Sequence, residues 1–176
     1  MNIRKAKKDE RLAKRRFEGR TEPTTIEPAA NADKDKKTFT IKDLPGLVAA
    51  IQLTSGPSEP LIEATRGIRR MLSITYNPPV KEVVDAGALP HLVELLMRTD
   101  CFALQFEATW ALTNVASTNF TSAVADSPNA IQNLINLLRS PSAEVREQSA
   151  WCLGNIAGDG PGYRDTLLRC GAMEPL

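Results

Sequence analysis

From about residue 40 onward, apolar residues recur at the three- and four-residue spacing that places side chains on one face of an α-helix. In the stretch around residue 150, Ser140 suits a helix N-cap, Pro141 suits the first helical position and Gly158 suits a C-terminal stop. These signals predict a helix over residues 141–157. Its buried stripe consists of small and apolar side chains: Val145, Ser149, Cys152, Leu153 and Ile156. No segment alternates as a β-strand would.

The helical pattern repeats along the chain. Residues 88–96 match residues 130–138 at an offset of 42, and the pair Gly87-Ala88 returns as Gly171-Ala172. A period near 42 residues is typical of solenoids built from two- or three-helix repeats. The copy before residue 141 has an equivalent buried stripe: Leu104, Ala108, Ala111, Leu112 and Val115. A more divergent first copy aligns residues 63–65 with residues 107–109, and we therefore predict an all-α solenoid.

A second stripe lies beside the buried one. Trp110 and Trp151 are 41 residues apart, and each is followed four residues later by an asparagine, Asn114 or Asn155. A helix brings positions i and i+4 onto one face, so each repeat presents an indole beside a carboxamide. Indole faces bind cationic side chains, and a carboxamide can donate to and accept from a peptide backbone. We call these four residues the Trp/Asn ladder and predict that it binds an extended Lys/Arg-rich peptide; the alternative is that both indoles pack between adjacent repeats.

Charge divides the chain at its N-terminus. Residues 1–20 carry nine Lys and Arg residues against three acids, a net charge of +6, whereas the remainder carries 13 basic and 18 acidic residues, a net charge of −5. The basic segment has too few large apolar residues to bury against a core, so we expect residues 1–38 to be a flexible tail. Phe17 is its only aromatic residue, which argues against stacking of nucleic-acid bases.

Several function classes are disfavoured by composition. No apolar run approaches the roughly 18 to 20 residues that span a bilayer, and the basic N-terminus lacks the apolar core of a secretory signal, which favours an intracellular location. Cys101, Cys152 and Cys170 lack metal-ligand spacing and read as reduced thiols. His91 is the sole histidine, and no nucleophile or phosphate loop can be assigned to it. We therefore predict neither an enzyme nor a bound cofactor or metal.

Four motifs together resemble the importin alpha family, the armadillo-repeat adaptors of nuclear import. They are Trp110-Ala-Leu-Thr-Asn114, Trp151-Cys-Leu-Gly-Asn-Ile-Ala-Gly-Asp159, Arg98-Thr-Asp-Cys101 and Arg4-Lys-Ala-Lys-Lys-Asp9. The resemblance implies a right-handed α-superhelix with a concave groove that takes up nuclear localisation signals. Residues 39–176 would then form armadillo repeats 1–3 and the start of repeat 4, in the cytoplasm and nucleus.

The resemblance also implies roles for single residues. Trp110 and Trp151 would sandwich the aliphatic stems of signal lysines, and the two ladder asparagines would bond the peptide backbone. Gln148 and Asp159 fall on groove positions of the family, with Asp159 pairing with the most demanding lysine. Ser117 and Thr121 lie in the corresponding turn, which is shorter here than in the family.

Residues 1–38 resemble the second half of the family's importin-beta-binding region. The basic residues that would take part in autoinhibition and importin-beta binding are Arg4, Lys5, Lys7, Lys8, Arg11, Lys14, Arg15 and Arg16. Lys14-Arg15-Arg16 match the autoinhibitory cluster, which occupies the groove until importin beta removes it. The arginine-rich first half of that region is missing, and the chain stops where the next repeat should begin. We therefore expect a chain truncated at both ends, with weakened importin-beta binding.

Two competing classes remain open at this point. A general armadillo or HEAT-like scaffold would bind acidic or helical partners without reading basic peptides, and it gives the ladder asparagines no binding role. A nucleic-acid binder would show salt-sensitive binding that is lost with residues 1–20. The expected partners are instead cargo proteins that carry nuclear localisation signals, with importin beta, and neither nucleic acid nor a membrane.

Overall fold

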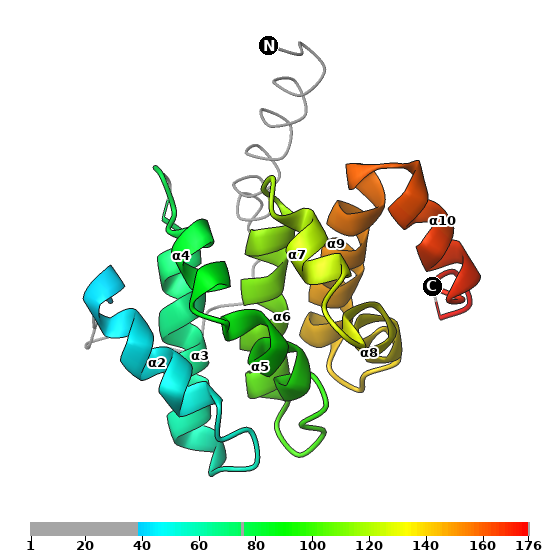
Figure 1. The fold of residues 1–176 in the computed structure, drawn as a ribbon. Helices are drawn as coiled ribbons and strands as arrows, with labels where there is room; N and C mark the ends of the chain where they lie inside the picture. Colours follow the sequence, from blue (N-terminus) through cyan, green and yellow to red (C-terminus); the bar gives the residue numbers. More distant parts are fainter. Residues whose placement is uncertain (1–38, 75, 176) are drawn as a thin grey trace, which may run out of the picture. The chain divides into compact units, whose positions relative to one another are not determined.

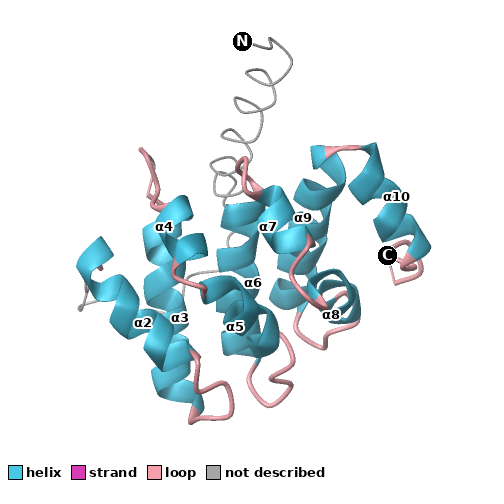
Figure 2. Ribbon diagram, in the orientation of Figure 1, coloured by secondary structure: helices cyan, strands magenta, loops and turns pink. Residues whose placement is uncertain are grey.

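A computed structural model describes residues 39–74 and 76–175. This part of the chain contains helices and no strands (Figure 2). None of its helices is both long enough and apolar enough to cross a membrane. The predicted basic tail, with Arg4, Lys5, Lys7, Lys8, Arg11, Lys14, Arg15 and Arg16, lies outside the described residues.

The helices follow one another in groups that repeat (Figure 1). The first group contains η1 (Ile41–Asp43), α2 (Leu44–Ile51) and α3 (Ser58–Leu72). The second contains α4 (Val80–Asp85), α5 (Ala88–Leu95) and α6 (Phe102–Ala116). The third contains α7 (Thr121–Ala125), α8 (Ala130–Leu137) and α9 (Ala143–Asp159), and α10 (Pro161–Arg169) follows. Each group ends in a long helix that is preceded by shorter ones.

The long helices pack side by side in chain order. α3 lies against α6 and α6 lies against α9, while α2, α5 and α8 form a second layer on them (Figure 1). We call the packing of α3 against α6 the first junction and the packing of α6 against α9 the second junction. Each repeat covers an apolar face of its neighbour, as a solenoid requires. The predicted all-α solenoid is confirmed.

The repeat period is visible in the backbone. Gly87, Asn129 and Gly171 stand 42 residues apart and have positive φ angles of 73°, 62° and 76°. Gly87 and Asn129 immediately precede α5 and α8. Left-handed backbone is cheap for glycine and tolerated by asparagine, so one turn geometry recurs with two residue types. The return of Gly87 as Gly171 therefore marks the same turn.

The two predicted buried stripes are confirmed. All five residues of the α6 stripe and four of the α9 stripe have no exposed surface, and Leu153 is 6% exposed. These side chains join one hydrophobic core with those of the other helices. The described part of the chain is therefore held together mainly by apolar packing along the stack.

The predicted bounds of the third long helix are wrong by two residues at each end. α9 begins at Ala143, because Ser142 is the N-cap and its Oγ accepts from the Val145 amide at 3.4 Å. Ser140 has another role, since its Oγ accepts from the Ser142 amide. The helix runs past Gly158 to Asp159 and stops at Gly160. Gly160 precedes Pro161, and a residue before proline is pushed out of the helical region.

Candidate functional site

The ladder residues lie at equivalent positions of two neighbouring long helices, α6 and α9. Trp110 on α6 and Trp151 on α9 are both half-buried, so each indole keeps part of its surface accessible. Asn114 and Asn155 lie one turn further along and are only 7% and 2% exposed. In both repeats the indole is therefore more accessible than the carboxamide one turn further along.

Both ladder carboxamides hydrogen-bond to the preceding repeat. Asn114 Nδ2 donates to Ser73 Oγ at 3.0 Å, and Asn155 Nδ2 donates to the Thr113 carbonyl at 3.3 Å. Asn155 Oδ1 is buried and accepts no hydrogen bond. An amide NH2 has two hydrogens and an amide oxygen has two lone pairs, so each asparagine retains unused capacity. The asparagines thus have a structural role at the junctions that the sequence did not reveal.

At the first junction a cation already lies on the ladder. The Arg69 guanidinium carbon is 4.4 Å from the centroid of the Trp110 ring, and the Phe106 ring meets the same indole edge-to-face at 5.5 Å. Arg69 Nε also donates to Glu107 Oε2 at 2.8 Å, and Arg66 Nε donates to Glu107 Oε1 at 2.9 Å. Glu107 is 6% exposed, so its carboxylate is nearly enclosed by the two arginines. An indole and a carboxylate together hold one guanidinium.

The second junction has neutral partners at the equivalent positions. Thr113 takes the place of Arg69 and Gln148 takes the place of Glu107 when the long helices are aligned by their repeats. Gln148 Nε2 donates to Thr113 Oγ1 at 2.9 Å. Within residues 39–74 and 76–175, no cation or aromatic ring stacks on Trp151. The small Thr113 side chain therefore leaves the indole of the second junction without the cover that Arg69 gives Trp110.

Cys152 lies beneath this second junction and has no exposed surface. Burial raises the pKa of its thiol to about 12, against a smaller lowering effect of a hydrogen bond with Thr113. A thiol with such a pKa stays protonated at neutral pH and is a poor nucleophile. The residue is a packing element of the junction.

Ser117 and Thr121 use their hydroxyl protons inside their own turn. Ser117 Oγ donates to the Asn114 carbonyl at 2.8 Å, and Thr121 Oγ1 lies 2.9 Å from the Ala116 carbonyl and 2.8 Å from the Thr118 carbonyl. Both residues are buried, at 7% and 1% exposed. In this arrangement they stabilise the turn between α6 and α7, and their hydroxyl oxygens retain only acceptor capacity.

Asp159 is exposed at the C-terminal end of α9, one turn after Asn155. The carboxylate acts on Tyr163. Burial is the main cause that raises the pKa of Tyr163, and the nearby carboxylates of Asp126 and Asp159 raise it further. The Tyr163 hydroxyl also contacts the Asp126 carboxylate at 3.3 Å. The predicted acidic position therefore lies in a negative region at the end of the ladder.

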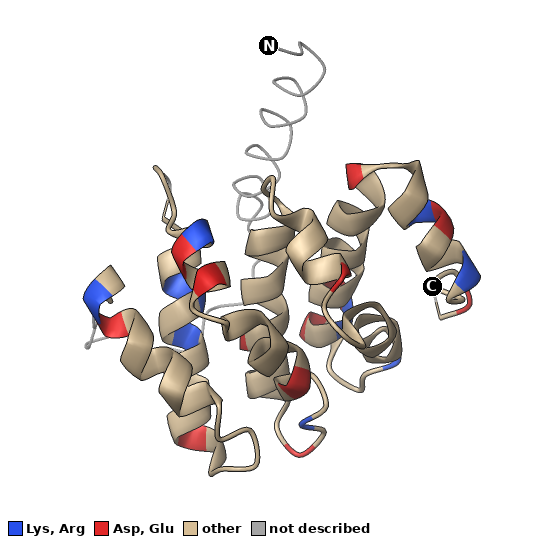
Figure 3. Ribbon diagram, viewed as in Figure 1, with Lys and Arg blue, Asp and Glu red and all other residues tan. Residues whose placement is uncertain are grey.

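Charge is distributed unevenly over the long helices (Figure 3). α3 carries Arg66, Arg69 and Arg70 with Glu59 and Glu63, whereas Glu107 is the single charged residue of α6. Because Arg66 and Arg69 share Glu107, the contacts between the two helices carry an excess of positive charge, which makes the first junction the cationic end of the ladder.

The edges of the two junctions also differ. At the first, Arg98 in the turn after α5 donates from Nη1 to the carbonyls of Thr54 (2.8 Å) and Gly56 (3.0 Å), and from Nη2 to Ser58 Oγ (2.9 Å). At the second, Ser140 occupies the position that matches Arg98 at an offset of 42.

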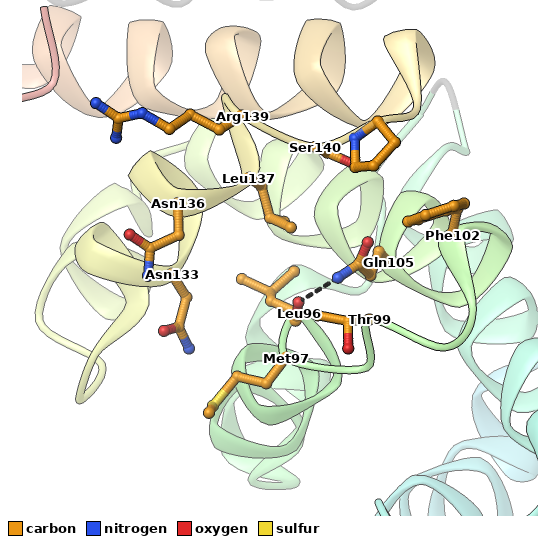
Figure 4. Close-up of a pocket in the computed structure, with 11 residues that line it drawn as sticks. Leu96, Met97, Thr99, Phe102, Gln105, Asn133, Asn136, Leu137, Arg139 and Ser140 are labelled. Carbon is orange, nitrogen blue, oxygen red and sulfur yellow. Dashed lines mark hydrogen bonds between the residues drawn. The ribbon is translucent and has the colours of Figure 1, made fainter. Parts of the chain in front are cut away.

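A short serine leaves this second edge open as a pocket of about 510 Å³ (Figure 4). Two of its lining residues are joined by the hydrogen bond that Figure 4 marks: Gln105 Nε2 donates to the Leu96 carbonyl at 2.8 Å. The side chains around it are Leu96, Met97, Thr99, Phe102, Gln105, Asn133, Asn136, Leu137, Arg139, Ser140 and Pro141.

Metal-ligand chemistry is not assembled in the part of the chain that the structure describes. No group of three or more His, Cys, Asp or Glu side chains lies close enough there to hold a metal ion. Cys101, Cys152 and Cys170 are unpaired thiols, and His91 lies on α5 with Nδ1 3.9 Å from Glu94 Oε2.

The sequence interpretation missed Arg69 and Thr113. Both residues lie one position before the ladder-asparagine position, and the equivalent residue of the third long helix is Gly154. The change at this aligned position from arginine to threonine to glycine could have indicated the difference between the junctions, because only a long cationic side chain can reach the next indole. The contact itself joins residues that are 41 apart in sequence, which helical periodicity does not address.

Comparison with known families agrees with this architecture. The armadillo/beta-catenin-like repeat matches residues 77–117, and a HEAT-like repeat matches residues 103–156. Over its whole length the chain is 42% identical to importin subunit alpha-6 of Arabidopsis thaliana, of which it covers 33%. It is 44% identical to importin subunit alpha-1b of Oryza sativa subsp. japonica over 77% of this chain and 25% of that protein. The chain thus spans about a third or less of the length of these curated relatives.

Solved structures give the same fold. An engineered protein aligns with a TM-score of 0.69 at 34% identity, covering 76% of this chain and 54% of that one. A designed armadillo repeat protein in complex with the peptide (KR)4 aligns with a TM-score of 0.63 at 30% identity, covering 77% of this chain and 58% of that one.

Proposed function

This chain is an armadillo-repeat protein homologous over its whole length to importin alpha subunits, and we propose that it is a nuclear import adaptor whose Trp/Asn ladder binds Lys/Arg-rich nuclear localisation signals. It would act in the cytoplasm and nucleus, by binding and without catalysis. Its cargo would be any protein that exposes such a signal in extended form.

The observation that carries this proposal is the arginine on Trp110. A guanidinium 4.4 Å from the ring centroid is within the distance of about 6 Å at which a cation and an indole attract each other. The surface therefore already stabilises one cationic side chain, which comes from the chain itself. Trp151 repeats the indole one junction further on, beside neutral partners, and the resemblance to a designed protein in complex with (KR)4 agrees with an external ligand there.

Each site residue then has a physical task. A lysine or arginine stem would pack between Trp110 and Trp151, where its charge meets the indole faces. Asn155 Oδ1 is buried and accepts no hydrogen bond in the structure, so its carboxamide would turn outward to accept from a peptide N–H, and Asn114 would bond the backbone one repeat earlier. Asp159 would pair with a cation at the far end of the ladder. Gln148, which is 7% exposed, would contribute mainly by holding Thr113 away from the peptide.

Intrinsic fluorescence offers a direct test, because Trp110 and Trp151 are the only tryptophans in the chain. Titration of the full chain with a (KR)4 peptide should change the emission and saturate, whereas an (EK)4 peptide of the same length and zero net charge should bind much more weakly. Absence of any saturable change with (KR)4, for a folded protein at low salt, would contradict the proposal.

The basic tail would compete with signal peptides for the ladder of its own chain. Lys14-Arg15-Arg16 resemble the ligand, and tethering gives such a segment an effective concentration on the order of millimolar. Replacing the three residues with alanine should raise the apparent affinity for (KR)4, and added salt should narrow the difference. The same tail would provide the contact with importin beta, which a binding assay with and without residues 1–20 would detect.

The buried asparagines favour one alternative, a scaffold that binds other partners without reading basic peptides. Asn114 and Asn155 both have partners in the preceding repeat, so their presence is explained without a peptide. The two functions differ in their response to mutation. Trp151→Ala should weaken (KR)4 if the ladder reads cations, and should leave partner binding unaffected in a scaffold that uses another face.

A further inference from the structure

We propose that Arg69 ends the basic-peptide site at the first junction, so that the ligand residue lying beyond Trp110 must be acidic or neutral and not basic. This inference rests on the proposed function and adds a specificity rule to it. The rule concerns the border of the site, where Arg69 covers the face of Trp110 that is turned toward α3.

Arg69 is held too firmly to be displaced by a ligand lysine. Its Nε bonds Glu107 Oε2 at 2.8 Å, its Nη2 reaches Glu107 Oε1 at 3.4 Å, and its guanidinium covers the indole at 4.4 Å. Only 15% of the Arg69 side chain and 8% of the Glu107 side chain are exposed. Displacing Arg69 would leave Glu107 with Arg66 alone, in a site that water hardly reaches. The covered face of Trp110 is therefore closed to the peptide.

The border also carries net positive charge. Two arginines, Arg66 and Arg69, share the single carboxylate of Glu107, and on the same helix the charge of Arg70 offsets that of Glu63, so the border keeps an excess of one positive charge. The Arg66 side chain is 39% exposed, so that charge faces the solvent. A lysine placed there is repelled and a glutamate is attracted. At the second junction Thr113 and Gln148 bring no charge, so a basic residue is accepted beside Trp151.

The test uses the full chain and four labelled peptides in fluorescence anisotropy. One is a plain block of four lysines, two carry Glu-Glu at its N-terminal or its C-terminal end, and the fourth is extended by Lys-Lys to six lysines. On the side that passes Trp110, the Glu-flanked peptide should bind about fivefold tighter than the Lys-flanked one, the effect of one partly exposed charge contact. In Arg69→Gln the ratio should fall to within about twofold, and Arg69→Lys, which keeps the charge, should retain most of it.

The matched control is Arg164→Gln, which removes an exposed cation from α10, away from both junctions. This variant should keep the wild-type ratio. Equal binding of Glu- and Lys-flanked peptides by the wild type, or an unchanged ratio in Arg69→Gln, would overturn the inference while the plain lysine block still binds. If the plain block does not bind, the proposed function fails, and the border rule fails with it.

Discussion

The two junctions share one helical frame and differ in what seals them. At the first, Arg69 and Arg66 enclose the Glu107 carboxylate, and Arg98 fastens the turn before α3 at the edge. At the second, Thr113 and Gln148 form one neutral hydrogen bond, and the corresponding edge is an open pocket. A repeat protein can thus close one interface with ion pairs and keep the next one accessible, without altering its backbone or its core.

The difference between the junctions lies in polar residues beside the core and not in the apolar core that stabilises the fold. Apolar stripes on α6 and α9 are buried to the same extent at both junctions, so the core does not distinguish them. The polar residues one position away from the stripes do, because they decide whether an indole is already occupied. The side chains that differ in charge between the two junctions therefore form a thin polar layer beside a core that is buried at both.

The largest contrast we expect is in thiol reactivity. At pH 8, Cys152, with a pKa of about 12, should be alkylated by iodoacetamide at least about a thousandfold more slowly than exposed Cys170, because the thiolate is the reactive form. Mass spectrometry of peptides at timed intervals measures both rates in one sample. Comparable rates for Cys152 and Cys170 would mean that the second junction opens readily.

The next contrast is in the free energy of unfolding. Glu107→Ala leaves two arginines facing each other without their shared carboxylate, and should cost about 2 kcal/mol, less than a fully buried pair because Arg66 is partly exposed. Gln148→Ala removes one neutral hydrogen bond at the equivalent position and should cost about 1 kcal/mol.

Urea unfolding followed by circular dichroism measures both costs. Added salt should restore part of the stability of Glu107→Ala, since it screens the repulsion between Arg66 and Arg69, and should leave Gln148→Ala unchanged. Equal costs with equal salt dependence would show that the ion pairs do not distinguish the two junctions.

Particular residues show which features could be predicted from the sequence. The buried stripes, the 42-residue period and the shared helix face of Trp110 and Trp151 follow from periodicity, since that depends only on helix geometry. The bounds of α9 do not, because Ser140 and Ser142 are both plausible caps and only the packed chain selects between them. The tail residues and the peptide-binding roles stay predictions.

The Arg69–Trp110 contact could not be predicted from the sequence, for a different reason. Its two residues are on separate helices, and their approach depends on how α3 rests against α6. Alignment of the repeats places Arg66, and not Arg69, in the tryptophan column, so the sequence does not show which side chain covers the indole.

A smaller contrast concerns the two indoles as binding groups. Trp151→Ala should weaken (KR)4 by about 1 to 2 kcal/mol, the range for a partly desolvated cation–π contact, and Trp110→Ala should lie at the lower end because one of its faces already holds Arg69. Isothermal titration calorimetry on both variants gives the values. A greater loss from Trp110→Ala than from Trp151→Ala would reverse the assignment of the open and closed junctions.

The smallest effect we expect is the acid sensitivity of the edge of the first junction. Asp100 bonds Arg98 through both carboxylate oxygens, at 2.8 Å each, and these hydrogen bonds lower the pKa of Asp100 to about 2. A carboxyl whose pKa is lower in the folded than in the unfolded chain stabilises the fold above the unfolded value of about 4, and this contribution fades as pH falls toward 2. Asp100→Asn should therefore be slightly less stable than the wild type by the same margin at pH 7 and pH 5, and the margin should shrink at pH 3. Asp165→Asn on α10 removes an exposed carboxylate away from both junctions and controls for net charge. Urea midpoints for the three proteins across this pH range measure the margin, and one that stays constant down to pH 3 would mean that Arg98 fastens the edge through the Thr54 and Gly56 carbonyls and the Ser58 hydroxyl, without Asp100.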